Sequence, residues 1–292
     1  MSMTILLSET HAEAIIFAAD RQIVANAEDP DDPRQFVHQR WARKVFPVKR
    51  HHGVVGFHGW ANVGSPPQDV DKVIEEFIEQ DNRYQTYSDF ESLLEGLRLR
   101  MQHLTQSSRE RYPVGLHAAG YVVTKGGVEH PRFYCFRNYN SESGAPRQSD
   151  VVDEWWHPRL DFLSKDSDPK LSDPEIHAAA TNALLRSGRV DCRFNGDVYS
   201  VNRTLLMIES YVRTYTHDLG IPIDSVERIA RLAAFKIAVA EAFWVMYASR
   251  DPPVAGPVDV VIVEPGKVPR AAVGSPFDVV SSKAVSPPAR VV

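Results

Sequence analysis

The sequence predicts an α+β fold, because its strand-like and helix-like segments come in separate blocks. Strands open the chain, two amphipathic helices follow, more strands come next, and two helices and a last strand complete the order. Separate blocks of this kind favour layered α+β packing over an alternating parallel sheet. With 43% hydrophobic and 24% charged residues, the chain also has the composition of a globular protein with a sizeable core.

Two pairs of strands are expected near the start of the chain. Residues 5–7 and 14–18 are short apolar runs with a polar turn at 9–11 between them, which is typical of strands. Residues 44–48 and 53–57 predict a second strand pair around a basic turn. The acidic, proline-punctuated segment 28–33 between the two pairs predicts a loop.

The middle of the chain predicts two amphipathic helices, at 69–82 and 89–105. Apolar residues recur at spacings of three and four in both segments, which places them on one helical face. Ser88 and Glu91 predict a capping box at the start of the second helix. The remaining expected elements are strands at 117–123 and 132–136 around a turn at 125–127, helices at 201–216 and 225–249, and a strand at 258–263.

The chain is expected to form one domain over residues 1–264. Residues 137–175 are polar and dotted with prolines, which indicates an insertion, with Trp155 and Trp156 as its apolar anchor. Residues 265–292 are rich in Pro, Ser and Val, a composition that predicts a loose C-terminal tail.

Several classes of function are disfavoured by composition. The net charge is −5 without a basic stripe, which argues against nucleic-acid binding. The longest apolar run near the N-terminus spans only residues 14–19, which is too short for a membrane span. We therefore expect no membrane association and a cytoplasmic location. The 11 histidines include no HExxH or Cys/His spacing, so no metal site is expected. Cys135 and Cys192 are expected to be buried apolar residues rather than a disulfide framework.

Four residues near the chain start supply the parts of a hydrolytic site. A terminal threonine holds nucleophile and base in one residue, since its own α-amine can take the hydroxyl proton. A nearby lysine keeps that amine neutral, a carboxylate holds the lysine, and a backbone N–H stabilises the oxyanion. Thr4, Asp20, Lys44 and Gly56 provide these types in order along two adjacent strand pairs, which pairing strands can bring together.

The run from Thr4 to Arg21 resembles the start of a mature proteasome β subunit or of its bacterial relative, the HslV peptidase. Those families begin with threonine and place an acidic residue 16 positions later, as Asp20 stands here relative to Thr4. Lys44 and Gly56 are 12 positions apart, which is the HslV-like spacing. The tetrapeptide Gly-Phe-His-Gly at 56–59 resembles the family's Gly-Phe-Ala-Gly. The segment 250–262 resembles the family's ending, with Asp251 as the carboxylate beside the N-terminus. The likeness covers 4–135 and 196–264.

The resemblance implies a four-layer αββα sandwich of the N-terminal nucleophile class and a threonine-type peptidase acting on polypeptides. It further implies homo-oligomeric stacked rings, an ATPase or unfoldase partner, and no cofactor. Thr4 would attack, Gly56 would stabilise the oxyanion, Lys44 and Asp20 would set the electrostatics, and Asp251 would orient the amine. Strand alternation puts residues 54, 56 and 58 on one face, so the pocket for the substrate side chain is expected to be bordered by Ala42, Val54 and His58 and to prefer apolar side chains.

The chain departs from the family pattern at several places. Its loop between Asp20 and Lys44 is longer, Val254 stands where proteasome subunits carry serine, and Ser200 is the nearest match to the family's glycine-serine turn. Met1-Ser2-Met3 precede Thr4, so a free Thr4 requires translation from Met3 or self-cleavage of the Met3–Thr4 bond.

Each candidate residue also has a plain structural interpretation. Thr4 is a good β-former, Asp20 suits a turn and can pair with Arg21, and Lys44 suits an edge strand. Gly56 suits close strand packing, and Asp251 suits a helix stop. Two alternatives to the peptidase therefore stay open: a catalytically inactive proteasome-like subunit acting as scaffold or binding module, and an N-terminal nucleophile amidohydrolase acting on a small amide.

Overall fold

The fold is mixed α+β and is built on antiparallel sheets, as the block order of the sequence predicts. The computed structural model describes residues 5–26, 36–106, 113–139, 151–156, 159–160, 169–195, 207–211, 214, 225–247 and 257–272. Within the described residues, no helix is both long and apolar enough to cross a membrane.

The first sheet has five strands in the order β13-β1-β2-β14-β15, all antiparallel. Its centre is β2, a strand in which every side chain is buried; strands buried on both faces read as continuous apolar runs, as 14–19 does. The strand bounds are β1 Leu6–Thr10, β2 Ile15–Asp20, β13 Asp191–Asn195, β14 Val258–Val263 and β15 Arg270–Ala271.

The second sheet has six strands, with the path β11-β10-β9-β6-β5 and β12 paired to β10. Two further strand pairs, β3 with β4 and β7 with β8, form small separate sheets. The strand bounds are β3 Gln22–Asn26, β4 Phe36–Trp41, β5 Val45–Val48, β6 Gly53–Gly59, β7 Asn62–Val63, β8 Gln68–Asp69, β9 Val114–Val123, β10 Glu129–Tyr139, β11 Val151–Trp156 and β12 Arg159–Leu160.

The helices expected at 69–82, 89–105 and 225–249 are confirmed as α1, α2 and α5. Part of the helix expected at 201–216 is described, and residues 207–211 are helical there. The helix bounds, with two 3-10 turns, are α1 Val70–Tyr84, α2 Phe90–Gln106, α3 Pro174–Arg186, α5 Val226–Tyr247, η1 Lys49–His51 and η4 Pro169–Ser172.

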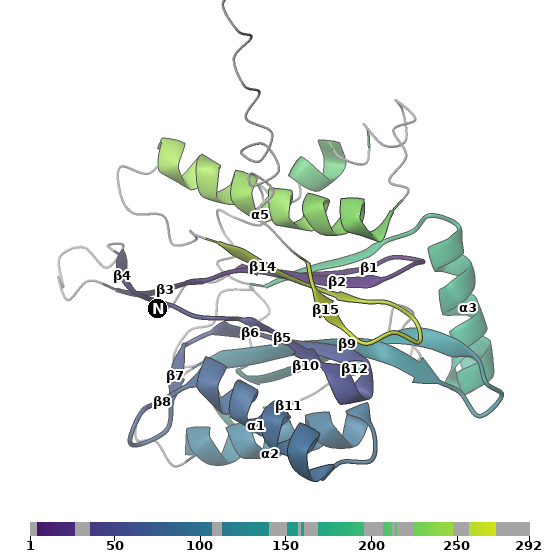
Figure 1. The fold of residues 1–292 in the computed structure, drawn as a ribbon, viewed down its shortest axis with the longest axis horizontal. Helices are drawn as coiled ribbons and strands as arrows, with labels where there is room; N and C mark the ends of the chain where they lie inside the picture. Colours follow the sequence, from purple (N-terminus) through teal and green to yellow (C-terminus); the bar gives the residue numbers. More distant parts are fainter. Residues whose placement is uncertain are drawn as a thin grey trace, which may run out of the picture.

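Helix α5 lies over the first sheet, and helices α1 and α2 lie on the far side of the second (Figure 1). Three apolar clusters hold these layers together. One lies between α5 and the first sheet and includes Ile5, Leu7 and Ile237. The second joins the facing surfaces of the two sheets through residues such as Phe17 and Phe133. The third lies between the second sheet and helices α1 and α2. Strand β1 therefore packs against helix on one face and sheet on the other.

Three segments differ from the expected organisation. Within the expected insertion 137–175, β11 and β12 pair with β10, so this segment extends the second sheet instead of standing outside the core. Past the expected boundary at 264, β15 pairs with β14 and carries the first sheet to Ala271. Helix α3 was not expected, although Asp173 as N-cap, accepting a hydrogen bond from the N–H of Glu175, and Pro174 in the first turn are readable start signals.

Candidate functional site

Asp20 and Lys44 form an enclosed ion pair at the point where β2 ends and β5 begins. Asp20 is the last residue of β2, and Lys44 directly precedes β5. The Lys44 Nζ lies 2.9 Å from Asp20 Oδ2 and 2.5 Å from the Gln22 carbonyl oxygen. Lys44 is 0% exposed and Asp20 1% exposed. The sequence-based expectation that a carboxylate holds this lysine in place agrees with the geometry.

The same carboxylate also binds the beginning of β1. The backbone N–H of Ile5 donates to Asp20 Oδ1 at 3.0 Å, and the N–H of Gln22 donates to Oδ2 at 3.1 Å. Ile5 directly follows Thr4, which lies outside the described residues. The Lys44 ammonium and the peptide nitrogen one residue beyond Thr4 are thus both ligands of one carboxylate.

Burial disfavours the charged form of both Lys44 and Asp20. Burial lowers the pKa of Lys44 from its usual value, the charge of Asp20 opposes that effect, and Arg40 adds to it. Burial likewise raises the pKa of Asp20, although Lys44 and the two backbone N–H groups oppose it. Burial therefore opposes the charged form of both partners, and the attraction between Lys44 and Asp20 and the charge of Asp259 favour it.

A second buried lysine pair, not foreseen from the sequence, has the opposite electrostatics. Lys236 on α5 lies with its Nζ 2.5 Å from Glu9 Oε1 and also binds Glu209. Burial works to raise the pKa of Glu9, but His11 and Lys236 outweigh it and the pKa falls from 4.5 to about 2. Burial works to lower the pKa of Lys236, but the charges of Glu9 and Glu209 outweigh it and the pKa rises. This pair is held firmly ionised.

The position of Glu9 corrects the expected turn at 9–11. Glu9 and Thr10 belong to β1, and Glu9 is 0% exposed. Glu9, Cys192 and Glu209 offer ligand atoms within 4.8 Å of one another. Because the Lys236 ammonium binds both of these carboxylates, their charge is already compensated by a cation from the chain itself.

Gly56 is required for close packing between the sheets. A Cβ on Gly56 would stand 2.7 Å from Leu6 Cδ1. Along β6, the N–H of Phe57 donates to the Lys44 carbonyl, whereas the N–H of Trp60 donates to the Pro113 carbonyl just before β9. Since N–H directions alternate along a strand, the N–H of Gly56 points toward β9, away from Lys44.

The same alternation directs the N–H of Gly59 to the side of Lys44. Gly59 ends β6 and has a φ of +91°, and a Cβ there would meet the Pro113 carbonyl oxygen at 2.3 Å. Of the two glycines in the 56–59 tetrapeptide, Gly59 is therefore the one whose backbone donor points to the β5 edge of β6.

The three residues expected to border a substrate pocket lie in different surroundings. Val54 belongs to the cluster between the sheets, but Ala42 belongs to the cluster under α1 and α2. His58 is 4% exposed and lies between the sheets, with its Nδ1 3.5 Å from the Tyr139 hydroxyl. Burial lowers the pKa of His58 to about 3, and Arg137 adds to this effect. Strand alternation places Val54 and His58 on the side of β6 that meets the first sheet, whereas Ala42 packs on the side of α1 and α2.

Three of the expected site residues lie outside the described part of the chain. They are Thr4, Ser200 and Asp251. The geometry thus joins Asp20, Lys44 and the start of β1, and it separates Ala42 from Val54 and His58.

Comparison with protein-family models and with curated protein sequences finds no match to this chain.

Proposed function

We propose that this chain is a threonine-type peptidase of the proteasome-like N-terminal nucleophile class. The observation that carries the proposal is the single carboxylate of Asp20, which binds the Lys44 ammonium at 2.9 Å and the Ile5 N–H at 3.0 Å. This arrangement brings a lysine with lowered pKa to the residue after Thr4. The packing order of helix, sheet, sheet and helices is in keeping with an αββα sandwich.

In the proposed reaction, the Thr4 hydroxyl attacks an amide carbonyl of a polypeptide and its proton passes to the Thr4 α-amine. The amine then protonates the leaving nitrogen, and an acyl ester remains on Thr4 until water hydrolyses it. Lys44 sets the electrostatics of the amine, and Asp20 holds Lys44. The oxyanion is stabilised by a backbone N–H on the Lys44 side of β6, for which Gly59 is better oriented than Gly56. Asp251 orients the amine, no cofactor takes part, and the active form is a homo-oligomeric ring served by an ATPase or unfoldase.

Substitution of the two buried lysines separates catalysis from stability. Lys44→Met and Lys236→Met each remove one partner of a buried pair, which costs about 3–5 kcal/mol of folding free energy. We expect Lys44→Met to lower kcat/KM on fluorogenic peptides by about 10²–10⁴-fold, and Lys236→Met to leave the activity of the folded fraction unchanged. Equal losses in the two variants would contradict the proposal.

If Lys44→Met does not fold, Lys44→Arg provides the same test. Arginine keeps the positive charge for Asp20, but its charge is spread over a planar guanidinium of different shape and does not stand at the position of the lysine ammonium. We expect a folded protein with the same loss of turnover.

The inactive-subunit alternative is favoured by one observation, the complete enclosure of Lys44, which a structural ion pair would share. Intact mass of the native protein decides whether residue 4 is the N-terminus. A peptide epoxyketone, whose ketone and epoxide carbons take the hydroxyl and the amine of one terminal threonine, then reports the site. A mass retaining residues before Thr4 together with no adduct supports the scaffold, and an adduct without peptide turnover supports a small-amide substrate.

A further inference from the structure

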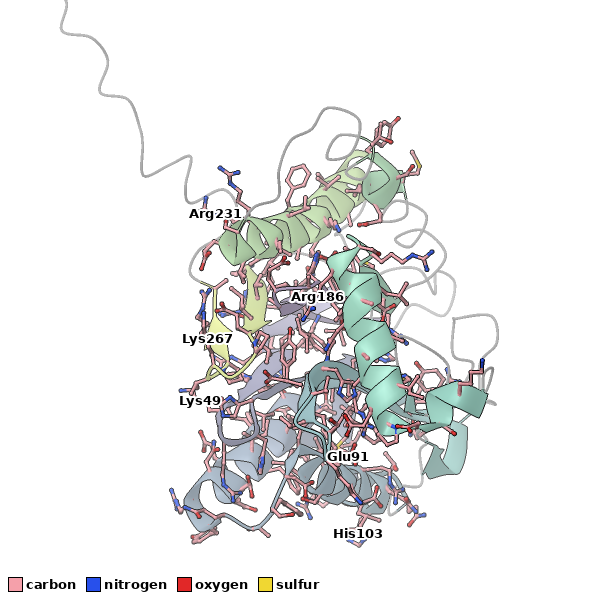
Figure 2. The ribbon with its side chains drawn as sticks, turned by 90° about the vertical axis from the view of Figure 1, so that its right-hand side faces the viewer. Lys49, Glu91, His103, Arg186, Arg231 and Lys267 are labelled. Atoms are coloured by element: carbon pink, nitrogen blue, oxygen red, sulfur yellow. The ribbon has the colours of Figure 1, made fainter. Side chains whose placement is uncertain are left out.

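A cavity of about 340 Å³ lies at the edge of the two sheets beside α3. Figure 2 faces this side of the molecule, with Arg186 on α3 and Lys267 in the turn between β14 and β15. Ala12, in the turn between β1 and β2, is part of the cavity wall. The cavity therefore lies at the α3 end of the fold, and Ile5, just before β1, lies at the opposite end of that strand. The full lining is Ala12, Tyr121, Val128, Glu129, Pro131, Asn182, Leu185, Arg186 and Pro265.

One side of the cavity carries an acidic group without a cationic partner. Glu129 Oε1 accepts a hydrogen bond from the Gly266 N–H at 3.2 Å, and no lysine or arginine of the described residues forms an ion pair with Glu129. The Tyr121 hydroxyl is enclosed and lacks a hydrogen-bond partner in the described part of the chain. Burial raises the pKa of Tyr121, and the charges of Glu129, Glu13 and Glu264 add to it. The Tyr121 hydroxyl can accept a hydrogen bond, and the nearby carboxylates favour a positively charged donor beside it.

The other side carries a basic group that is equally unpaired. Arg186 is exposed, and no carboxylate of the described residues pairs with it. Asn182 stands one helical turn earlier on the same face of α3, and its Nδ2 donates to the Glu129 carbonyl at 2.8 Å. Arg186 therefore follows, one helical turn later, the residue that binds the backbone of Glu129. Opposite charges line one cavity without binding each other.

The rest of the wall is apolar and the volume is small. Five of the lining residues have no polar side-chain group, among them Val128 and Leu185. The volume of about 340 Å³ is at the lower end of the roughly 300–1,000 Å³ that ligand pockets span.

We propose that this cavity binds a small zwitterion of the α-amino acid class, with its ammonium at Glu129, its carboxylate at Arg186 and an apolar side chain against the remaining wall. The site is separate from the proposed hydrolytic centre and needs no residue of it.

Calorimetric titration with three related compounds tests this site. L-Leucine carries both charges, L-leucinamide lacks the carboxylate, and 4-methylpentanoate lacks the ammonium. Because a charged hydrogen bond is lost in each analogue, we expect both to bind at least about tenfold more weakly than leucine. Glu129→Gln and Arg186→Gln are each expected to weaken leucine binding by about the same factor.

Arg189→Gln is the matched control, since Arg189 is an exposed arginine just beyond the end of α3 and outside the lining. We expect it to leave leucine affinity unchanged. The proposal is overturned if no compound binds, if all three bind equally, or if Arg189→Gln weakens binding as much as Arg186→Gln. Repeating the titration with Thr4→Ala separates the two proposals, because loss of peptidase activity with retained leucine binding leaves this site standing.

Discussion

Lys44 and Lys236 are both enclosed beside carboxylates, and their surroundings give the two ammonium groups different chemistry. Lys236 binds two carboxylates, whereas Lys44 binds one carboxylate and one carbonyl oxygen. Burial outweighs the charges of Asp20 and Asp259 at Lys44, so its pKa falls, whereas the charges of Glu9 and Glu209 outweigh burial at Lys236, so its pKa rises. The two lysines therefore differ in how well nearby carboxylates offset their burial.

Glu9 makes a pH-dependent contribution to stability. Its pKa in the folded protein is about 2, against an ordinary value of 4.5, so its contribution is fully present above pH 4.5 and is lost as the pH falls toward 2. The full contribution is about 3 kcal/mol, of which about 1 kcal/mol is gone near pH 3.5. Urea unfolding at about pH 6.5 and about pH 3.5 measures this. Glu9→Gln is expected to lose less stability than the native protein between the two values, and an equal loss would contradict the assignment.

At the scale of elements, α3 is attached to the β9–β10 turn by one side chain. Glu175 in its first turn accepts hydrogen bonds from the Thr124 hydroxyl at 2.6 Å and the Gly126 N–H at 2.7 Å. Asp173 caps the same helix end separately by accepting from the Glu175 N–H at 2.9 Å. The helix start and its attachment to the hairpin therefore depend on different carboxylates.

Glu175→Ala tests the attachment of α3. We expect hydrogen exchange at the Gly126 amide to become about tenfold faster or more, because that N–H loses a charged acceptor. Asp173→Ala is the control, since it removes the cap at a cost of about 1 kcal/mol to the helix but leaves the Glu175 contacts with Thr124 and Gly126. If both substitutions accelerate exchange at Gly126 equally, the amide is protected by the helix as a whole and not by Glu175.

In the whole molecule, Asp20 and Lys44 belong to segments that lead to different sheets. Asp20 comes from the first sheet, and Lys44 leads into the second. The two segments also pair directly, because the Ala42 N–H donates to the Arg21 carbonyl at 2.8 Å. Phe17 is 0% exposed in the cluster between the sheets, with its ring 6.1 Å from that of Phe133. This layer is expected to be a main source of stability.

Phe17→Ala is therefore expected to reduce the free energy of unfolding by about 3–5 kcal/mol. Phe77→Ala on α1 is the control, because Phe77 is only partly buried and should lose less. Urea unfolding of both variants gives the comparison, and a smaller loss for Phe17→Ala would show that the inter-sheet layer is not a main source of stability.

The sequence by itself determined the elements with strong local patterns. The apolar runs of β2 and β14 predict strands, and the spacings of three and four in α1 and α2 predict amphipathic helices, because both patterns reflect which side chains must leave water. The pairing of Asp20 with Lys44 was also predictable, since a buried lysine needs a carboxylate and the two lie on neighbouring strand pairs.

Only the tertiary structure decided which face of each sheet meets which layer. Alternation predicts that Val54 and His58 share a face, but it does not say that Ala42 lies on the opposite one, because that depends on how the second sheet packs against α1 and the first sheet. For the same reason Glu9 was expected in a turn, although it is buried under α5 beside a lysine 227 positions away in the sequence. Short-range patterns record the preference of a segment for strand or helix, whereas the partner of a buried charge is set by long-range packing.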